Sequence, residues 1–229
     1  MPNKIINLAI VAQVAKGLQE LNDKMVFIGG AVISLYTDDP AADEIRPTTD
    51  IDMTINLANY TEWVQMQERL AELEFYPDPQ GKSICSYKFN DIAIDIMPAD
   101  DTSIGISNTW YKPGFNYIQQ IELSQDLKIN ILPSSYFLAT KLEAFKDRGK
   151  SDFYGSHDFE DIIYLIDNRT TIVQEIITSE EEVKQFLIQE LTAIKNYPHA
   201  AEILAMHIHP LIRKERFPLL MQKIESITS

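Results

Sequence analysis

The sequence predicts an α+β protein, with a small mixed-sheet domain over residues 1–132 followed by an all-helical domain over residues 133–229. Two observations carry this prediction. In the first part, short apolar or alternating runs are separated by turn residues, which is typical of strands interleaved with helices. From Ser134 onward, apolar residues recur at helical spacing between Gly, Asn, Pro and Ser signals. The domain boundary is therefore expected near Leu132.

The first domain is expected to open with an amphipathic helix over about residues 5–21. The apolar run 25–28 predicts a buried strand that ends at Gly29 and Gly30, where another helix should begin. The polar stretch 37–49 is expected to form an exposed loop. The other expected elements are a helix over 60–73 and two antiparallel hairpins, 83–89 with 91–97 and 119–123 with 128–132.

The helical domain is expected to contain six helices. Their approximate ranges are 135–147, 156–167, 171–177, 180–195, 198–207 and 211–226. The charged run from Arg213 to Arg216 is expected to be a solvated helix start. Neither an internal repeat nor a low-complexity tract interrupts the pattern.

Composition limits the classes of function. A net charge of −14 argues against a protein that binds bulk DNA, because such binding depends on Lys and Arg neutralising phosphates. No apolar run reaches the roughly 18 residues of a membrane span, so no membrane association is expected. The single cysteine, Cys85, is interpreted as a small buried hydrophobe. A cytoplasmic location is expected.

The strand predicted at residues 50–55 carries the chemistry. Its alternation puts Asp50 and Asp52 on one face, and Asp95 lies in phase on a later strand. Carboxylates about 5 Å apart repel by roughly 3 kcal/mol per pair at an effective dielectric of 20. Oxygen-only ligands suit Mg²⁺ or Mn²⁺, and two such ions are the usual apparatus for in-line nucleotidyl transfer. Asp95 could also act as the base, while Asp91, Asp100 and Asp101 are alternative third carboxylates.

Gly29 and Gly30 supply a second signal. A strand that ends in Gly-Gly at a helix start lets backbone N–H groups approach and hold phosphates. Alone, such a pair is more often an ordinary turn. Its order before Asp50-x-Asp52 favours a phosphate site.

These motifs resemble the nucleotidyltransferases of the AbiEii abortive-infection toxin type, within the DNA-polymerase-β-like superfamily. The matching residues are Ile28-Gly-Gly-Ala31, Arg46-x-Thr48-x-Asp50-Ile-Asp52, Lys141-x-x-Ala144-x-x-x-Arg148 and His157-Asp158-x-x-Asp161. The resemblance covers about residues 25–167. It implies a polymerase-β-like core with a helical C-terminal domain, and nucleotide transfer from an NTP such as ATP.

The resemblance also implies site residues. Asp50 and Asp52 would bind metal, and Lys141 and Asp158 would complete the catalytic set. The nucleotide-binding residues expected on this basis are Gly29, Gly30, Arg46, Thr48, Lys141 and Arg148. Ala31 and His157 depart from the pattern, since relatives often have a hydroxyl residue and a cation at these positions.

Several of these residues have a second interpretation. Lys141, Ala144 and Arg148 share one helix face, so the two cations could contact a triphosphate or form ion pairs with Asp158 and Asp161. Arg46 could bind phosphate or pair with Asp43 or Glu44. The His207-x-His209 pair does not place both rings on one helix face, so it is interpreted as structural.

The expected activity is therefore transfer of a nucleotidyl group to an acceptor hydroxyl. The resemblance favours an RNA end or a protein as acceptor, whereas the acidic charge favours a cationic small molecule. Two alternatives are a nucleotide-binding protein that has lost turnover, and a toxin–antitoxin-type interaction protein whose helical tail from Ile172 is the binding surface. A cognate antitoxin would be a further partner of a toxin.

Overall fold

The computed structural model describes residues 2–81, 83–100, 107–149 and 152–229. The chain divides into two compact units. The sheet unit comprises Met1–Ser34 and Glu44–Pro133, and the helical unit comprises Leu35–Asp43 and Ser134–Ser229. Within the described residues, the structure contains no helix that is long and apolar enough to cross a membrane.

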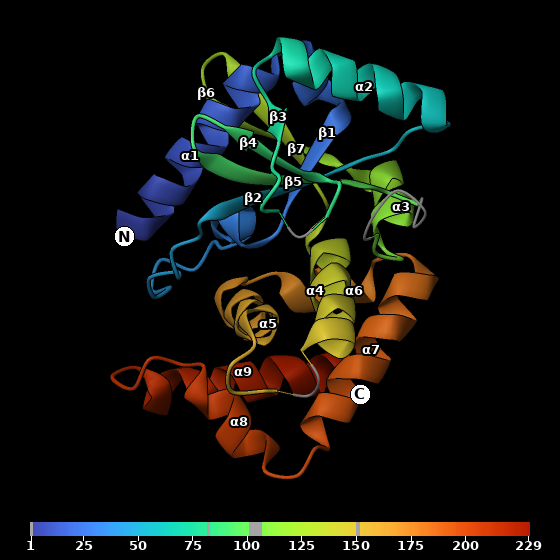
Figure 1. The fold of residues 1–229 in the computed structure, drawn as a ribbon. Coiled ribbons are helices and arrows are strands. Elements are labelled where there is room, and N and C mark those ends of the chain that lie inside the picture. Colours follow the sequence, from blue (N-terminus) through green and yellow to red (C-terminus); the bar gives the residue numbers. More distant parts are fainter. Residues whose placement is uncertain (1, 82, 101–106, 150–151) are drawn as a thin grey trace. The chain divides into compact units, whose positions relative to one another are not determined.

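In the described residues of the sheet unit, seven strands are joined by helices and turns (Figure 1). Its strands are β1 (Met25–Ile28), β2 (Asp50–Ile55), β3 (Tyr76–Pro77), β4 (Ser86–Phe89), β5 (Ile92–Pro98), β6 (Gln119–Ser124) and β7 (Leu127–Ile131). Its helices are α1 (Pro2–Leu18), α2 (Tyr60–Glu72) and α3 (Tyr111–Gly114), with 3-10 turns η1 (Gln19–Lys24), η2 (Gly30–Leu35) and η3 (Phe115–Tyr117).

The strands form one mixed sheet in the order β3-β4-β5-β2-β1-β7-β6. The pairs β2–β5 and β1–β7 are parallel, and the other neighbours are antiparallel. The β4–β5 hairpin turns at Asn90 and Asp91, whose φ angles of 48° and 65° match the turn that such two-residue loops prefer. The mixed sheet confirms the α+β class.

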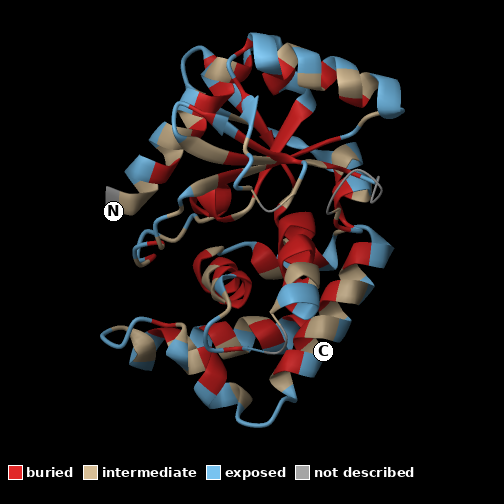
Figure 2. Ribbon diagram, in the orientation of Figure 1, coloured by how far each residue is buried: buried red, intermediate tan, exposed pale blue. Residues whose placement is uncertain are grey.

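The two faces of the central strands differ in chemistry. Ile51, Met53, Ile94 and Ile96 point to one face and are at most 1% exposed. Helices α1 and α2 lie over this apolar face (Figure 1), and Figure 2 shows its strands as largely buried. The opposite face carries the polar positions of the same strands, because side chains alternate along a strand.

Contacts fix both helices to the apolar face. In α1, a Cβ added at Gly17 would lie 2.8 Å from Phe89 Cε1, so the absence of a side chain lets α1 approach β4. In α2, Gln67 Nε2 donates to the Tyr87 hydroxyl at 3.2 Å. Phe75, after α2, stacks on Phe89 with a centroid separation of 4.3 Å. Helices α1 and α2 therefore cover the apolar face of the sheet.

The helical unit contains α4 (Ser134–Arg148), α5 (His157–Asn168), α6 (Ile172–Ile177), α7 (Glu181–Lys195), α8 (Ala200–Met206) and α9 (Arg213–Ile227). Helix α4 packs against α5, α6 and α7. The rings of Phe145, Phe153 and Phe159 pack together, with centroids 4.9–5.0 Å apart. These helices lie close to the ranges that the apolar spacing predicts, although α4 is buried on all sides from Ser134 to Leu142 and not along a single stripe.

Residues 35–43 were expected to belong to the first domain, with an exposed loop from residue 37. In the structure they pack with the helical unit. Asp39 Oδ2 lies 2.5 Å from Arg216 Nη1. The Tyr164 hydroxyl donates to the carbonyl oxygen of Asp43 at 2.8 Å. Ion pairing between distant residues decides this placement, and the local sequence pattern carries no sign of it.

The run from Arg213 to Arg216 was expected to be a solvated helix start, and Arg216 corrects this expectation. It is buried, with 7% exposure. Its Nε lies 3.1 Å from both carboxylate oxygens of Asp167, and its Nη2 donates to the Asp167 carbonyl oxygen at 2.8 Å. These bonds satisfy the buried guanidinium, as burial of a charge requires.

Smaller differences concern short elements. Residues 30–35 form the 3-10 turn η2 instead of an α-helix, and the first helix ends at Leu18 before η1 continues to Lys24. The two-residue strand β3 and the short helix α3 lack a sequence pattern, because elements of two to four residues are too short to show a period.

Candidate functional site

The candidate site lies on the polar face of the sheet unit, where two acids face each other. Asp52 on β2 and Asp95 on β5 are register partners in a parallel pair. Neighbouring strands lie about 4.8 Å apart, and register partners project to the same face. Both residues are half-buried. The register thus brings together two acids that are 43 positions apart in the sequence.

Asp50 lies on the same face of β2 as Asp52, two residues earlier. It is half-buried, and its Oδ1 accepts a hydrogen bond from the Thr48 hydroxyl at 3.0 Å. The same hydroxyl lies 3.3 Å from the Asp50 carbonyl oxygen. Thr48, expected to bind nucleotide, is therefore a hydrogen-bond donor to the first acid of the motif.

Ser86 on β4 is a site residue that the sequence analysis did not identify. It is the register partner of Asp95 across the antiparallel β4–β5 pair, and its Oγ donates to Asp95 Oδ1 at 2.6 Å. Ser86 is buried, with 6% exposure. The alternation of β4 was the available signal, since it places Ser86 in phase with the Asp95 face.

Gly29 adopts a backbone conformation that favours glycine, with φ of 75°. A Cβ at this position would overlap Asp52 Oδ2. Ile28, just before it, is the register partner of Asp52. The turn after β1 therefore lies directly against the Asp52 carboxylate.

Gly30 permits a second close approach. A Cβ at this position would lie 2.6 Å from Arg46 Nη2. Arg46 is half-buried. Its guanidinium thus lies at the Gly29-Gly30 turn, where a phosphate-binding cation is expected.

Asp50, Asp52 and Asp95 are the candidate ligands for Mg²⁺ or Mn²⁺. Carboxylate oxygens are the ligands that these hard cations prefer, so the donor type fits. Across residues 2–81, 83–100, 107–149 and 152–229, however, no group of three or more His, Cys, Asp or Glu side chains is gathered to hold an ion. The assignment of Asp50, Asp52 and Asp95 as metal ligands stays a prediction.

The alternative third acids lie elsewhere. Asp91 is exposed and forms part of the β4–β5 turn. Asp100 is exposed and pairs with Lys112. Asp101 lies outside the described residues. Asp95 is the acid in register with Asp52.

In the helical unit, Lys141 and Asp158 belong to a buried ion cluster. Lys141 Nζ lies 2.7 Å from Asp161 Oδ2 and 3.3 Å from Asp158 Oδ1. Arg148 donates to both oxygens of Asp158 at 2.7 and 2.9 Å. Lys141, Asp158 and Asp161 are at most 7% exposed. These are the ion pairs of the structural interpretation, while nucleotide contact by Lys141 and Arg148 stays a prediction.

Opposing effects act on Asp158. Burial alone would raise the pKa of Asp158, but the Arg148 hydrogen bonds and the charge of Lys141 outweigh it, so the pKa is lowered.

His157 is exposed, and its Nδ1 lies 3.2 Å from Glu160 Oε2. It is therefore paired with a neighbour on its own helix.

Other sequence candidates have structural surroundings. His207 Nε2 lies 2.7 Å from the Phe153 carbonyl oxygen, and its ring packs edge-on against Phe159. Cys85 is fully buried, and burial raises the pKa of its thiol to about 11, so little thiolate is present at neutral pH.

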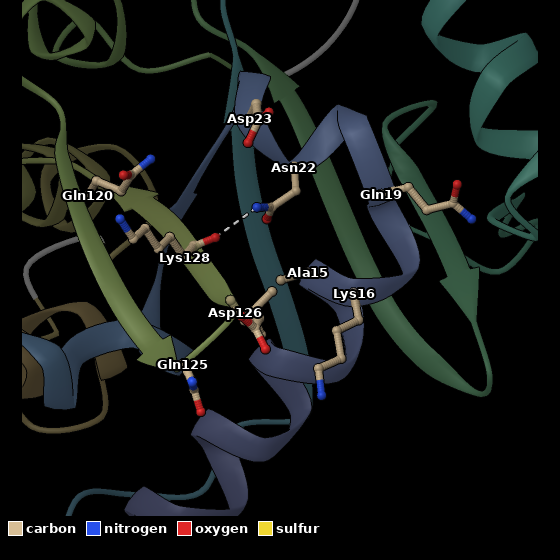
Figure 3. A pocket seen from close by; sticks show the side chains of 10 residues that line it. Ala15, Lys16, Gln19, Asn22, Asp23, Gln120, Gln125, Asp126 and Lys128 are labelled. Carbon is tan, nitrogen blue, oxygen red and sulfur yellow. Dashed lines mark hydrogen bonds between the residues drawn. The ribbon is translucent and has the colours of Figure 1, made fainter.

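A groove of about 500 Å³ lies at the other end of β1 (Figure 3). Asn22 and Asp23, which precede β1, line it together with Gln120 and Lys128 of the β6–β7 hairpin. Because Gly29 follows β1, the acids and this groove lie near opposite ends of the strand. The groove is therefore not the acidic site.

Comparison with solved structures decides the fold. A crystal structure of an antigenic nucleotidyltransferase-like protein from Paracoccidioides brasiliensis is similar to this chain, with a TM-score of 0.50 and 16% sequence identity. The match covers 96% of this chain and 92% of that chain. The chain has a nucleotidyltransferase-like fold. No protein-family model and no curated protein sequence matches it.

The nucleotidyltransferase-like fold confirms the core and the helical C-terminal part expected from the sequence. At 16% identity the similarity concerns the fold, so the AbiEii type is not confirmed by it. One fold carries many activities, so the chemistry of this chain depends on its acids, its glycine turn and Arg46.

Proposed function

We propose that this chain is a nucleotidyltransferase that moves a nucleotidyl group from an NTP to an acceptor hydroxyl. The observation that carries the proposal is the juxtaposition of Asp52 and Asp95, in register on β2 and β5, with the Gly29-Gly30 turn against Asp52. The fold is nucleotidyltransferase-like, and the acids lie next to a glycine turn that can bind phosphates. This arrangement suits transfer of a nucleotidyl group at the α-phosphorus of an NTP.

In the proposed reaction, the acceptor oxygen bonds to the α-phosphorus while the bond to the β-phosphate oxygen breaks, and pyrophosphate leaves. Asp95 takes the proton of the acceptor hydroxyl. Backbone N–H groups of the Gly29-Gly30 turn and the Arg46 guanidinium bind the triphosphate. Mg²⁺ or Mn²⁺, held by Asp50, Asp52 and Asp95, would neutralise charge on the phosphates and activate the hydroxyl.

The finer assignment within this proposal is an AbiEii-type enzyme. Its acceptor would be an RNA end or a protein, with a cognate antitoxin as a further partner. A cationic small molecule is the alternative acceptor, because a chain with net charge −14 attracts cations.

The experiment that tests the proposal measures transfer of label from an α-labelled NTP. The protein is incubated with each α-labelled NTP, Mg²⁺ and cell extract, with the Asp52→Asn variant as control. Label transferred by the wild type but not by the variant supports the proposal, and its location in RNA, protein or small molecules identifies the acceptor. Equal labelling by both proteins would refute it.

A second candidate function is a nucleotide-binding protein that has lost turnover. Such a protein would bind NTP but leave every extract component unlabelled. An interaction protein of the toxin–antitoxin kind would instead lose its partner, without any NTP binding, when the helices from Ile172 are deleted.

A further inference from the structure

Asn7 in α1 is a completely buried polar side chain, with 0% exposure. Its Nδ2 donates to the carbonyl oxygen of Arg46 at 3.3 Å, and its Oδ1 accepts from the Thr48 N–H at 3.3 Å. One amide therefore holds the backbone on both sides of Pro47. Because proline fixes its own φ, the loop has little freedom left between these two bonds.

The loop that Asn7 holds carries the cation at the glycine turn. Arg46 Nη2 lies so close to Gly30 that a Cβ there would be only 2.6 Å away. A guanidinium presents several N–H donors in a planar fork, which matches phosphate oxygens in two-point contacts. Such contacts depend on direction, so the path of the Arg46 backbone sets how well the fork meets a phosphate.

We infer that Asn7 is a positioning residue that aims Arg46 at the triphosphate of a bound NTP, so that α1 is part of the nucleotide site. The inference rests on the proposed function. Asn7 holds the loop backbone at Arg46 and Thr48, acts on the nucleotide through the Arg46 side chain, and does not itself contact the nucleotide. It sets NTP affinity, and with it KM, while kcat stays near the wild-type value.

The chain offers a matched control on the same helix. Asn3 lies one turn before Asn7, and its Nδ2 donates to the Ile45 carbonyl oxygen at 3.0 Å. Its backbone N–H donates to Glu44 Oε1 at 2.8 Å. Asn3 therefore holds the chain at Glu44 and Ile45, whereas Asn7 holds it at Arg46 and Thr48.

The experiment measures equilibrium binding of a fluorescent ATP analogue in Mg²⁺ buffer, with thermal unfolding of each variant. Asn7→Ala should weaken binding about two- to tenfold, the effect of losing one hydrogen-bonding side chain. Asn3→Ala should bind like the wild type. In an Arg46→Ala background, Asn7→Ala should add little, because both act through one side chain.

A second variant covers the case in which Asn7→Ala does not fold. Asn7→Asp keeps an acceptor for the Thr48 N–H but removes the donor to Arg46, so it should also weaken binding. If the folded Asn7 variants bind as the wild type does, or if Asn7→Ala weakens binding fully in the Arg46→Ala background, the inference is wrong and the proposed function stands. Absence of binding by the wild type would overturn both.

Discussion

Asp52 and Asp95 face each other across the parallel strands β2 and β5, and the Gly29 turn lies against Asp52. The two acids come from segments separated by helix α2 and by strands β3 and β4. Two carboxylates on one face repel, and the repulsion falls when a cation binds or when one charge is removed.

Asp52→Asn should abolish nucleotide transfer without lowering the melting temperature. Loss of a group that stabilises developing charge costs about 10²- to 10³-fold in rate. The substitution also removes one of two like charges, so the melting temperature should stay the same or rise. Labelled-NTP assays and thermal unfolding measure the two effects. Substantial transfer by the double variant Asp50→Asn, Asp52→Asn would contradict the metal-site assignment.

Asp95 should be a ligand of the ion that Asp52 binds. A crystal soaked with Mn²⁺ should show anomalous density in contact with carboxylate oxygens of both residues. Asp91→Asn is the matched control, since this exposed turn residue should leave the ion in place. Density that contacts Asp52 but leaves Asp95 free would show that the third acid has been misassigned.

Gly29→Ala should destabilise the protein and weaken NTP binding. A non-glycine residue at φ of 75° costs on the order of 1–3 kcal/mol, and the new Cβ would overlap Asp52 Oδ2. Chemical denaturation measures the free energy of unfolding. In an Asp52→Ala background the added loss should shrink, because the carboxylate is gone. An equal loss in both backgrounds would attribute the effect to backbone strain alone.

Lys141→Ala should lower the free energy of unfolding by about 3–5 kcal/mol, because it leaves Asp161 and Asp158 buried with one partner fewer. The control is Lys146→Ala on the same helix, whose half-exposed pair with Glu190 should contribute at most about 1 kcal/mol. Asp158→Ala should cost less in the Lys141→Ala background than in the wild type, because Arg148 is then the remaining one of the two cations that contact Asp158 in the described structure. If NTP affinity falls while stability is unchanged, Lys141 has the role that the family resemblance implies.

The contribution of Asp158 to the free energy of unfolding should decrease at acid pH. Its pKa is lowered in the folded protein, so the ionised carboxylate stabilises the fold. This contribution is complete above the unfolded pKa of about 3.9 and declines as the pH falls through the folded value. Unfolding free energies measured from pH 6 to pH 2 should therefore differ most between wild type and Asp158→Asn at the upper end. A constant difference across that range would contradict the prediction.

Much of the fold could be predicted because the signals are local. The apolar run 25–28 predicted the bounds of β1, and the alternation of residues 50–55 predicted those of β2. The helical spacing after Ser134 predicted helices α4 to α9, with bounds close to those in the structure. Strand β3 and helix α3 were missed because they are too short to have a period. The 3-10 turn at residues 30–35 was expected as an α-helix, since both patterns bury the same apolar side chains.

For the site, the strand pattern alone predicts which residue types lie in phase: two acids on one strand, a third acid on another, and a glycine pair after a buried strand. Which of these residues meet depends on the pairing of distant segments. The β2–β5 register places Asp52 opposite Asp95. Asn7 forms hydrogen bonds with the backbone of Arg46 and Thr48, and Asp39 forms an ion pair with Arg216 in the helical unit. Strand register and long-range hydrogen bonds join residues far apart in the chain, and local periodicity carries no information about such pairs.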